Sequence, residues 1–209
     1  MAILTIGDEF PEYDFRAVVG GVLSEIPVNK EEDYFTRVRS ADVPEGQWRL
    51  FIMWPKDFTF VCPTELAGIA GVYEDLQERH CDVVAVNTDS EYVHLAWRSK
   101  DELLKNVPFP LASDLTQEFV KAVGVLNRDG VCDRASYLVD PDNRVRFVSV
   151  DDGSVGRNAE ELVRQLDALQ SGGLTSCGWH PGEPTLDVFK AATNLSLIHI
   201  SEPTRRYAI

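Results

Sequence analysis

A nearly continuous apolar run that breaks directly into an amphipathic helix most constrains how this chain can fold. The run covers residues 48–54 and has the length of one strand. A strand with so few polar residues is typical of a sheet that is covered on both faces. A short loop leads from Pro55 to Cys62, and apolar residues from Leu66 to Leu76 then follow helical spacing. This order predicts a central strand of an α/β sheet, followed by a crossover helix.

The rest of the chain continues this alternation and then changes to antiparallel strands. Residues 1–30 predict an N-terminal strand or hairpin. The later elements are a strand over 82–87, a helix over 93–104, a short helix over 114–123, strands over 135–139 and 144–150, and a helix over 158–169. Together they predict a thioredoxin-like α/β fold: a mixed central sheet with helices on both faces and an N-terminal hairpin extension.

Composition predicts one folded domain with a C-terminal extension. The 209 residues are 44% apolar, and no internal break is rich in Pro, Gly or Ser, so the chain can bury one core. We place this domain at residues 1–170 and a C-terminal segment at 171–194. The tail at 195–209 fits neither the preceding helix nor the acidic body, which indicates a non-native or disordered end.

The charge and hydropathy patterns exclude several classes of function. The formal net charge is −14 at pH 7, whereas partners rich in phosphate, such as nucleic acids and anionic membranes, require a basic surface. The chain does not start with a basic segment followed by an apolar one, and its apolar runs have only strand length. We therefore expect a cytoplasmic protein that binds neither nucleic acid nor membrane.

The cysteines are too few and too scattered to form a disulfide scaffold. None of the four (Cys62, Cys81, Cys132 and Cys177) lies in a Cys-x-x-Cys pair, so we expect a reducing compartment, individual roles and no metal site. Cys81 precedes a buried strand, which favours packing. Cys132 lies two residues before Arg134, and the sequence leaves open whether it packs or approaches a reactive site.

Cys62 is the predicted nucleophile because its sulfur should lie at a helix N-terminus. Unpaired first-turn amides place about half a positive charge there, which favours a thiolate. This environment contributes up to ~2 kcal/mol, whereas making an ordinary thiol mostly anionic at neutral pH requires about 3.4 kcal/mol. A cation should therefore lie nearby, and Arg134 is the candidate. Thr59 can exchange a hydrogen bond with a bound oxygen, and Pro55 can shield the pocket.

Each of these residues also has a purely structural interpretation. Cys62 could be a small buried apolar residue at a corner between a strand and a helix. Thr59 could supply a turn hydroxyl, and Arg134 could form a surface ion pair. We expect His94 and Trp97, which lie on one predicted helix, to pack in the core or at a subunit contact.

The segment from Pro55 to Glu65 resembles the active-site motif of a known enzyme family. The spacing Pro55-x-x-x-Thr59-x-x-Cys62 is similar to that of the peroxiredoxins. The fuller segment is similar to the typical 2-Cys branch, and specifically to the bacterial alkyl hydroperoxide reductase C component. The resemblance extends over roughly residues 3–190.

This resemblance implies a thiol-dependent peroxidase that needs no cofactor and no metal. Cys62 would be the peroxidatic cysteine, and Pro55, Thr59 and Arg134 would complete its peroxide site. Glu65 matches the residue that orients the arginine in that family. The implied substrates are hydrogen peroxide and organic hydroperoxides.

The resemblance also assigns a role to Cys177, which lies beyond the last core helix in a segment that we expect to be flexible. Cys177 matches the resolving cysteine, which condenses with a sulfenic acid on Cys62 of a second chain to form an intersubunit disulfide. A homodimer is implied, and closure of dimers into a decamer is left open. The implied reductant is a thiol protein: a flavoprotein reductase, an AhpD-like protein or thioredoxin.

Two other functions remain open at the level of sequence. One is a thiol–disulfide oxidoreductase on the same fold, which the absence of Cys-x-x-Cys disfavours. The other is a ring-forming, redox-regulated chaperone or signalling scaffold whose cysteine chemistry is secondary. Consumption of peroxide in the presence of a dithiol separates these functions from a peroxidase.

Overall fold

One mixed sheet of seven strands organises the part of the chain that the structure describes, which is residues 2–27 and 30–187 of a computed structural model. Its strands, in spatial order, are β2 (Phe35–Arg39), β1 (Asp14–Val18), β5 (Leu111–Ser113), β4 (Cys81–Asn87), β3 (Trp48–Met53), β6 (Arg134–Val139) and β7 (Val145–Asp151). The central strands β3, β4 and β5 are parallel, and the other pairs are antiparallel. The predicted mixed sheet is confirmed.

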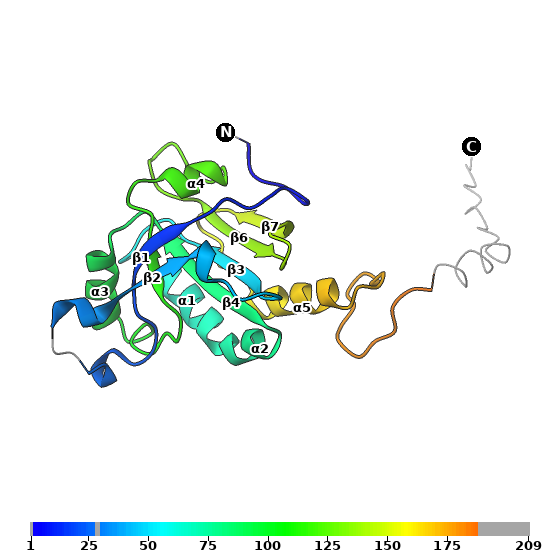
Figure 1. Ribbon diagram of the computed structural model, residues 1–209, viewed down its shortest axis with the longest axis horizontal. Helices are drawn as coiled ribbons and strands as arrows, with labels where there is room; N and C mark the ends of the chain where they lie inside the picture. The colour runs from blue at the N-terminus through cyan, green and yellow to red at the C-terminus, as the bar shows by residue number, and fades with distance from the viewer. Residues whose placement is uncertain (1, 28–29, 188–209) are drawn as a thin grey trace, which may run out of the picture. The chain divides into compact units, whose positions relative to one another are not determined.

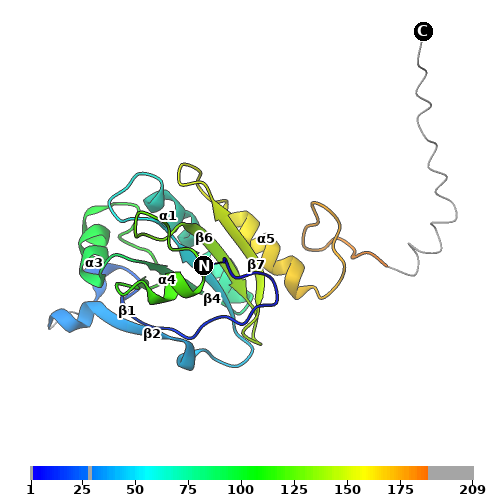
Figure 2. The same cartoon turned by 90° about the horizontal axis from the view of Figure 1, so that it is seen from above.

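Helices cover both faces of this sheet. They are α1 (Cys62–Gly71), α2 (Tyr73–Glu78), α3 (Glu91–Lys100), α4 (Glu118–Ala122) and α5 (Ala159–Gln170). In Figure 1, α4 lies above the sheet, and α1 and α2 lie below it. Figure 2 shows the same arrangement from above. None of the helices within residues 2–27 and 30–187 is long and apolar enough to cross a bilayer.

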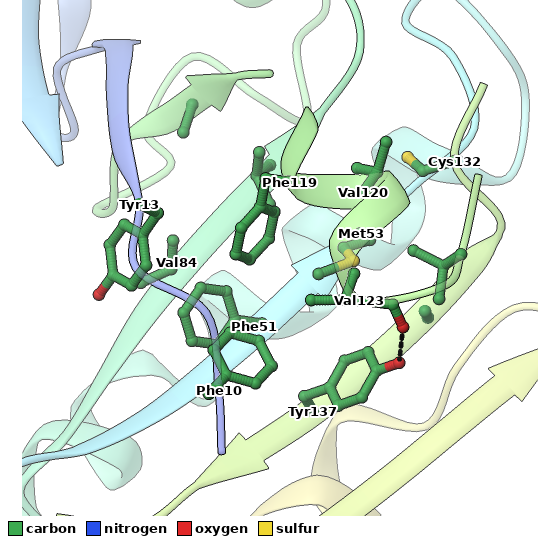
Figure 3. Packing of buried hydrophobic residues seen from close by; sticks show 14 of the residues in the cluster. Phe10, Tyr13, Phe51, Met53, Val84, Phe119, Val120, Val123, Cys132 and Tyr137 are labelled. Carbon is green, nitrogen blue, oxygen red and sulfur yellow. Dashed lines mark hydrogen bonds between the residues drawn. The ribbon is translucent and has the colours of Figure 1, made fainter. Parts of the chain in front are cut away.

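The chain divides after Leu166 into two compact units, and the sheet belongs to the first. Alternate residues of β3 point to opposite faces, and Leu50, Phe51, Ile52 and Met53 are all fully buried. A cluster of aromatic rings fills the face under α4 (Figure 3). Phe10 and Phe51 lie 4.4 Å apart between ring centroids within this cluster. Burial on both faces fixes the end of β3, from which the Cys62 loop departs.

Two strands differ from the prediction. The N-terminal hairpin does form, but β1 pairs with β2, so its second strand lies beyond residue 30. β5 was not predicted, because three residues are too few to show a strand pattern. β5 pairs with both β1 and β4 and so joins the hairpin to the rest of the sheet.

Three predicted helices have different limits in the structure. The helix that we predicted from Leu66 to Leu76 is divided at Val72, whose φ of −108° and ψ of 11° separate α1 from α2. α3 ends at Lys100, because the Asp101 side chain accepts a hydrogen bond from the Leu103 amide and forms a turn. α4 begins only at residue 118, since residues 114–117 form a turn.

The second compact unit begins at Asp167 and contains a loop that closes on itself. Leu174 and Leu186 form an antiparallel bridge, in which the Leu186 amide lies 2.7 Å from the Leu174 carbonyl. Between them, Trp179 is buried, and its indole nitrogen donates to the Glu183 carbonyl at 3.0 Å. The segment that we expected to be flexible is therefore a closed loop, and Cys177 is exposed on it. The predicted tail at 195–209 lies outside the described residues.

Candidate active site

Cys62 is the first residue of α1 and is only 2% exposed. No side chain caps the helix at Val61, and Pro63 stands in the first turn, where its missing N–H leaves no bond unmade. The amides of Thr64 and Glu65 donate to the Val61 carbonyl at 3.1 Å and 3.3 Å. The helix end therefore offers fewer free amides than the sequence led us to expect, and a neighbouring cation becomes more important.

Arg134 provides that cation. It is the first residue of β6, which lies beside β3 in the sheet. Its Nη1 atom lies 3.7 Å from the Cys62 sulfur, and its Nη2 atom donates to the Gly153 carbonyl at 2.8 Å. The side chain is 2% exposed, so water screens this contact very little. The structure thus brings together the predicted nucleophile and the predicted cation.

Glu65 lies in the first turn of α1, as Cys62 does, and it accepts hydrogen bonds from two arginines. It accepts a hydrogen bond from Nη1 of Arg134, and its other oxygen accepts from the backbone amide and Nε of Arg157, both at 2.9 Å. Arg157 also donates to the Ala135 carbonyl at 2.8 Å. Burial, together with the positive charge of the nearby Arg134, lowers the pKa of Arg157 to about 10. Glu65 therefore fixes the orientation of the guanidinium that contacts the sulfur.

Positive charge predominates among the buried side chains beside Cys62. Arg134 and Arg157 contribute two positive charges, and Glu65 contributes one negative charge, with all three side chains no more than 4% exposed. Asp151 adds a negative charge near Arg157 and offsets part of this excess. A thiolate on Cys62 would place its negative charge beside Arg134. The arrangement is thus suited to an anionic sulfur nucleophile.

Thr59 and Pro55 lie on the loop that leads to Cys62, and both are half-buried. The Thr59 hydroxyl donates to the Lys56 carbonyl at 2.9 Å, which leaves its oxygen free to accept a further hydrogen bond. Within the described residues, neither Thr59 nor Pro55 forms a hydrogen bond to the sulfur. Phe58, just before Thr59, has a φ of 55°. A bulky residue in this region stores about 1–3 kcal/mol of strain.

Cys132 and Cys81 are buried packing residues. The Cys132 thiol donates to the Trp54 carbonyl at 2.8 Å and lies among the apolar side chains under α4 (Figure 3). Burial raises the pKa of both thiols. The described part of the chain has no group of three or more His, Cys, Asp or Glu residues that could hold a metal ion.

We expect Cys132→Ala to leave the rate of peroxide consumption within about twofold of wild type, because a buried neutral thiol is a poor nucleophile. Loss of the sulfur and its hydrogen bond should lower the free energy of unfolding by about 1–2 kcal/mol. A peroxidase assay and urea denaturation measure the two effects. A disulfide at Cys132 in peptide maps of the oxidised protein would contradict the packing role.

Arg157 is the residue of this cluster that the sequence did not reveal. It stands alone in the loop before α5, where no periodic pattern marks it. A count of charges offers one signal. Arg134 is shared between Glu65 and the Cys62 sulfur, so the second oxygen of Glu65 can pair with another cation.

The chain is similar to known proteins over most of its length. The model of the AhpC/TSA family matches residues 6–148. The chain is 56% identical over 187 residues to alkyl hydroperoxide reductase C of Mycolicibacterium smegmatis, a match that covers 90% of this chain and 95% of that protein.

Solved structures give the same result. The Mycobacterium tuberculosis AhpC structure superposes with a TM-score of 0.81 at 47% identity and covers 86% of this chain and 100% of its own. A reduced Plasmodium vivax 2-Cys peroxiredoxin gives a TM-score of 0.81 at 28% identity, covering 92% of this chain and 99% of its own. The thioredoxin-like fold predicted from the sequence is confirmed.

Proposed function

The chain belongs to the AhpC/TSA family, and from this membership we propose that it is a thiol-dependent peroxidase that reduces hydrogen peroxide and organic hydroperoxides. The observation that carries the proposal is the contact of 3.7 Å between the buried Cys62 sulfur and Nη1 of Arg134. The names of two similar proteins, alkyl hydroperoxide reductase C and 2-Cys peroxiredoxin, support the same substrate class.

In the proposed first step, the Cys62 thiolate attacks the terminal oxygen of the hydroperoxide. An S–O bond forms and the O–O bond breaks, so that sulfur is oxidised to a sulfenic acid and the peroxide leaves as water or an alcohol after it takes up a proton. Arg134 and the Cys62 amide stabilise charge on the separating oxygens. The Thr59 oxygen accepts a hydrogen bond from the hydroxyl group of the peroxide. Glu65 and Arg157 keep the Arg134 guanidinium in place, and Pro55 shields the pocket.

In the proposed second step, the thiol of Cys177 attacks the sulfenic acid on Cys62 of a partner chain. A disulfide forms and water leaves, and an external dithiol then reduces the disulfide by exchange. The exposure of Cys177 supports this role. The proposal therefore includes a homodimer, a thiol reductant protein and a cytoplasmic location, where such reductants are supplied.

Peroxide consumption in the presence of a small dithiol tests the function directly. The wild-type chain should consume hydrogen peroxide until the dithiol is exhausted. A wild-type protein that consumes none while its Cys62 thiol remains free and reactive would refute the peroxidase proposal.

Cys177→Ser should lose sustained turnover and keep one oxidation event per chain, because Cys62 can still form a sulfenic acid that no resolving thiol removes. Non-reducing gel electrophoresis after peroxide treatment should show a dimer band for wild type and none for this variant. Cys81→Ser, which changes a buried cysteine, is the matched control and should keep the band. A dimer band of full intensity in Cys177→Ser would exclude the resolving role.

A further inference from the structure

We propose that Asp57 and His94 form a buried positioning pair for the peroxide site, and that they act by holding the turn that carries Thr59. Neither residue has a role in the mechanism above. The inference rests on the proposed peroxidase function and adds to it a support beneath the loop.

The pair is fully enclosed. Nδ1 of His94 lies 2.6 Å from Oδ2 of Asp57, and the two side chains are 0% and 1% exposed. Nε2 of His94 lies 3.1 Å from the Ala112 carbonyl. A carbonyl can only accept, so Nε2 carries a proton and a second proton lies between Nδ1 and the carboxylate. The pair is therefore neutral as a whole, which makes its burial tolerable.

Asp57 ties the loop to several elements of the fold at once. Its Oδ1 atom accepts from Nε1 of Trp54 at 2.8 Å and from Nδ2 of Asn87 at 3.0 Å. Its backbone amide donates to the Asp89 carboxylate at 2.9 Å. These partners lie on different parts of the fold: just after β3, at the end of β4, after β4, and, for His94, on α3. A single loop residue is thus anchored in four places.

The anchor lies next to the strained part of the loop. Phe58 follows Asp57 directly and has the left-handed φ of 55°, and Thr59 comes next. A bulky residue keeps such a conformation only where its surroundings fix it. Asp57 fixes the turn on one side, and the hydrogen bond from Thr59 to the Lys56 carbonyl closes it on the other. The position of the Thr59 oxygen therefore depends on the Asp57–His94 pair.

The experiment compares two reactions of Cys62 in Asp57→Ala. Oxidation by hydrogen peroxide, followed by stopped flow, should slow by about 10-fold to 100-fold, because a displaced Thr59 no longer meets the substrate. Alkylation by iodoacetamide should stay within about twofold of wild type, because it depends on the thiolate and not on the peroxide site. Asp57→Asn should keep peroxide oxidation within about threefold, since its amide can donate to a neutral His94 and accept from Trp54.

A double-variant cycle then tests the route of action. If Asp57 acts through Thr59, adding Asp57→Ala to Thr59→Ala should lower the peroxide rate by less than about twofold further. His94→Leu tests the same pair from α3, in case Asp57→Ala does not fold. His80→Asn, an exposed histidine before β4, is the matched control and should behave as wild type.

Three results would overturn the positioning role. They are a wild-type peroxide rate in Asp57→Ala or His94→Leu, an equal loss of the peroxide and iodoacetamide rates, and losses that multiply in the double variant. A wild-type protein that does not react with peroxide would instead refute the proposed function. Variants as reactive as a peroxide-reactive wild type would refute this inference alone.

Discussion

Cys62→Ser should consume peroxide no faster than a protein-free control, a loss of more than about 1,000-fold in turnover, because a serine hydroxyl is not ionised near neutral pH and is a poor nucleophile without a base. The surrounding cluster of Arg134, Glu65 and Arg157 stays in place, since its hydrogen bonds do not use the sulfur as their main acceptor. The fold should therefore survive. A peroxidase assay with a dithiol and a thermal unfolding curve measure activity and stability on the same sample.

Cys81→Ser is the matched control for this loss. Cys81 is also buried, but it begins β4 and has no role in the cluster around Arg134. Its replacement should leave turnover within about twofold of wild type, as expected for a residue away from the reacting atoms. Sustained turnover in Cys62→Ser would mean that another residue is the nucleophile.

Glu65→Ala should lower the free energy of unfolding by about 3–5 kcal/mol, because it leaves two buried guanidinium groups without their carboxylate. The Glu65 side chain is 2% exposed, so water cannot readily replace it. The same change frees Arg134 to move away from the Cys62 sulfur, and we expect the oxidation of Cys62 by peroxide to slow as well. Urea denaturation gives the stability, and stopped flow gives the oxidation rate.

Glu78→Ala provides the comparison for Glu65→Ala. Glu78 is the exposed last residue of α2, and its loss should change the free energy of unfolding by less than about 0.5 kcal/mol. If Glu65→Ala unfolded at the same urea concentration as Glu78→Ala, the buried carboxylate would not be what holds the two arginines.

The sequence predicted one part of the site from local structure and another from the energetics of a thiolate. An apolar strand, a proline in the first turn and helical spacing after it were enough to place Cys62 at the start of α1. The need for a cation followed from the energetics of the thiolate, and the structure brings Arg134 to the sulfur from β6. The catalytic roles of all the predicted site residues remain predictions for the experiments above. These residues are Cys62, Thr59, Arg134, Pro55, Glu65 and Cys177.

The parts that the sequence did not predict depend on contacts between distant segments. Arg157 is 92 positions from Glu65, and His94 is 37 positions from Asp57. No sequence pattern around Arg157 or His94 identifies its partner. From the sequence we predicted only that His94 packs in the core or at a subunit contact. β5 was missed for a related reason, since a strand of three residues is defined by its neighbours in the sheet.

The closed loop from Leu174 to Leu186 affects how fast the proposed resolving step can be. Ordering a free segment consumes about 1–2 kcal/mol of conformational entropy per residue. The bridge at the ends of this loop and the bond from Trp179 to Glu183 have already ordered it. In the proposed resolving step, Cys177 would therefore move together with the whole ordered loop. Little of the loop would have to refold before the Cys177 sulfur meets the sulfur of the partner chain.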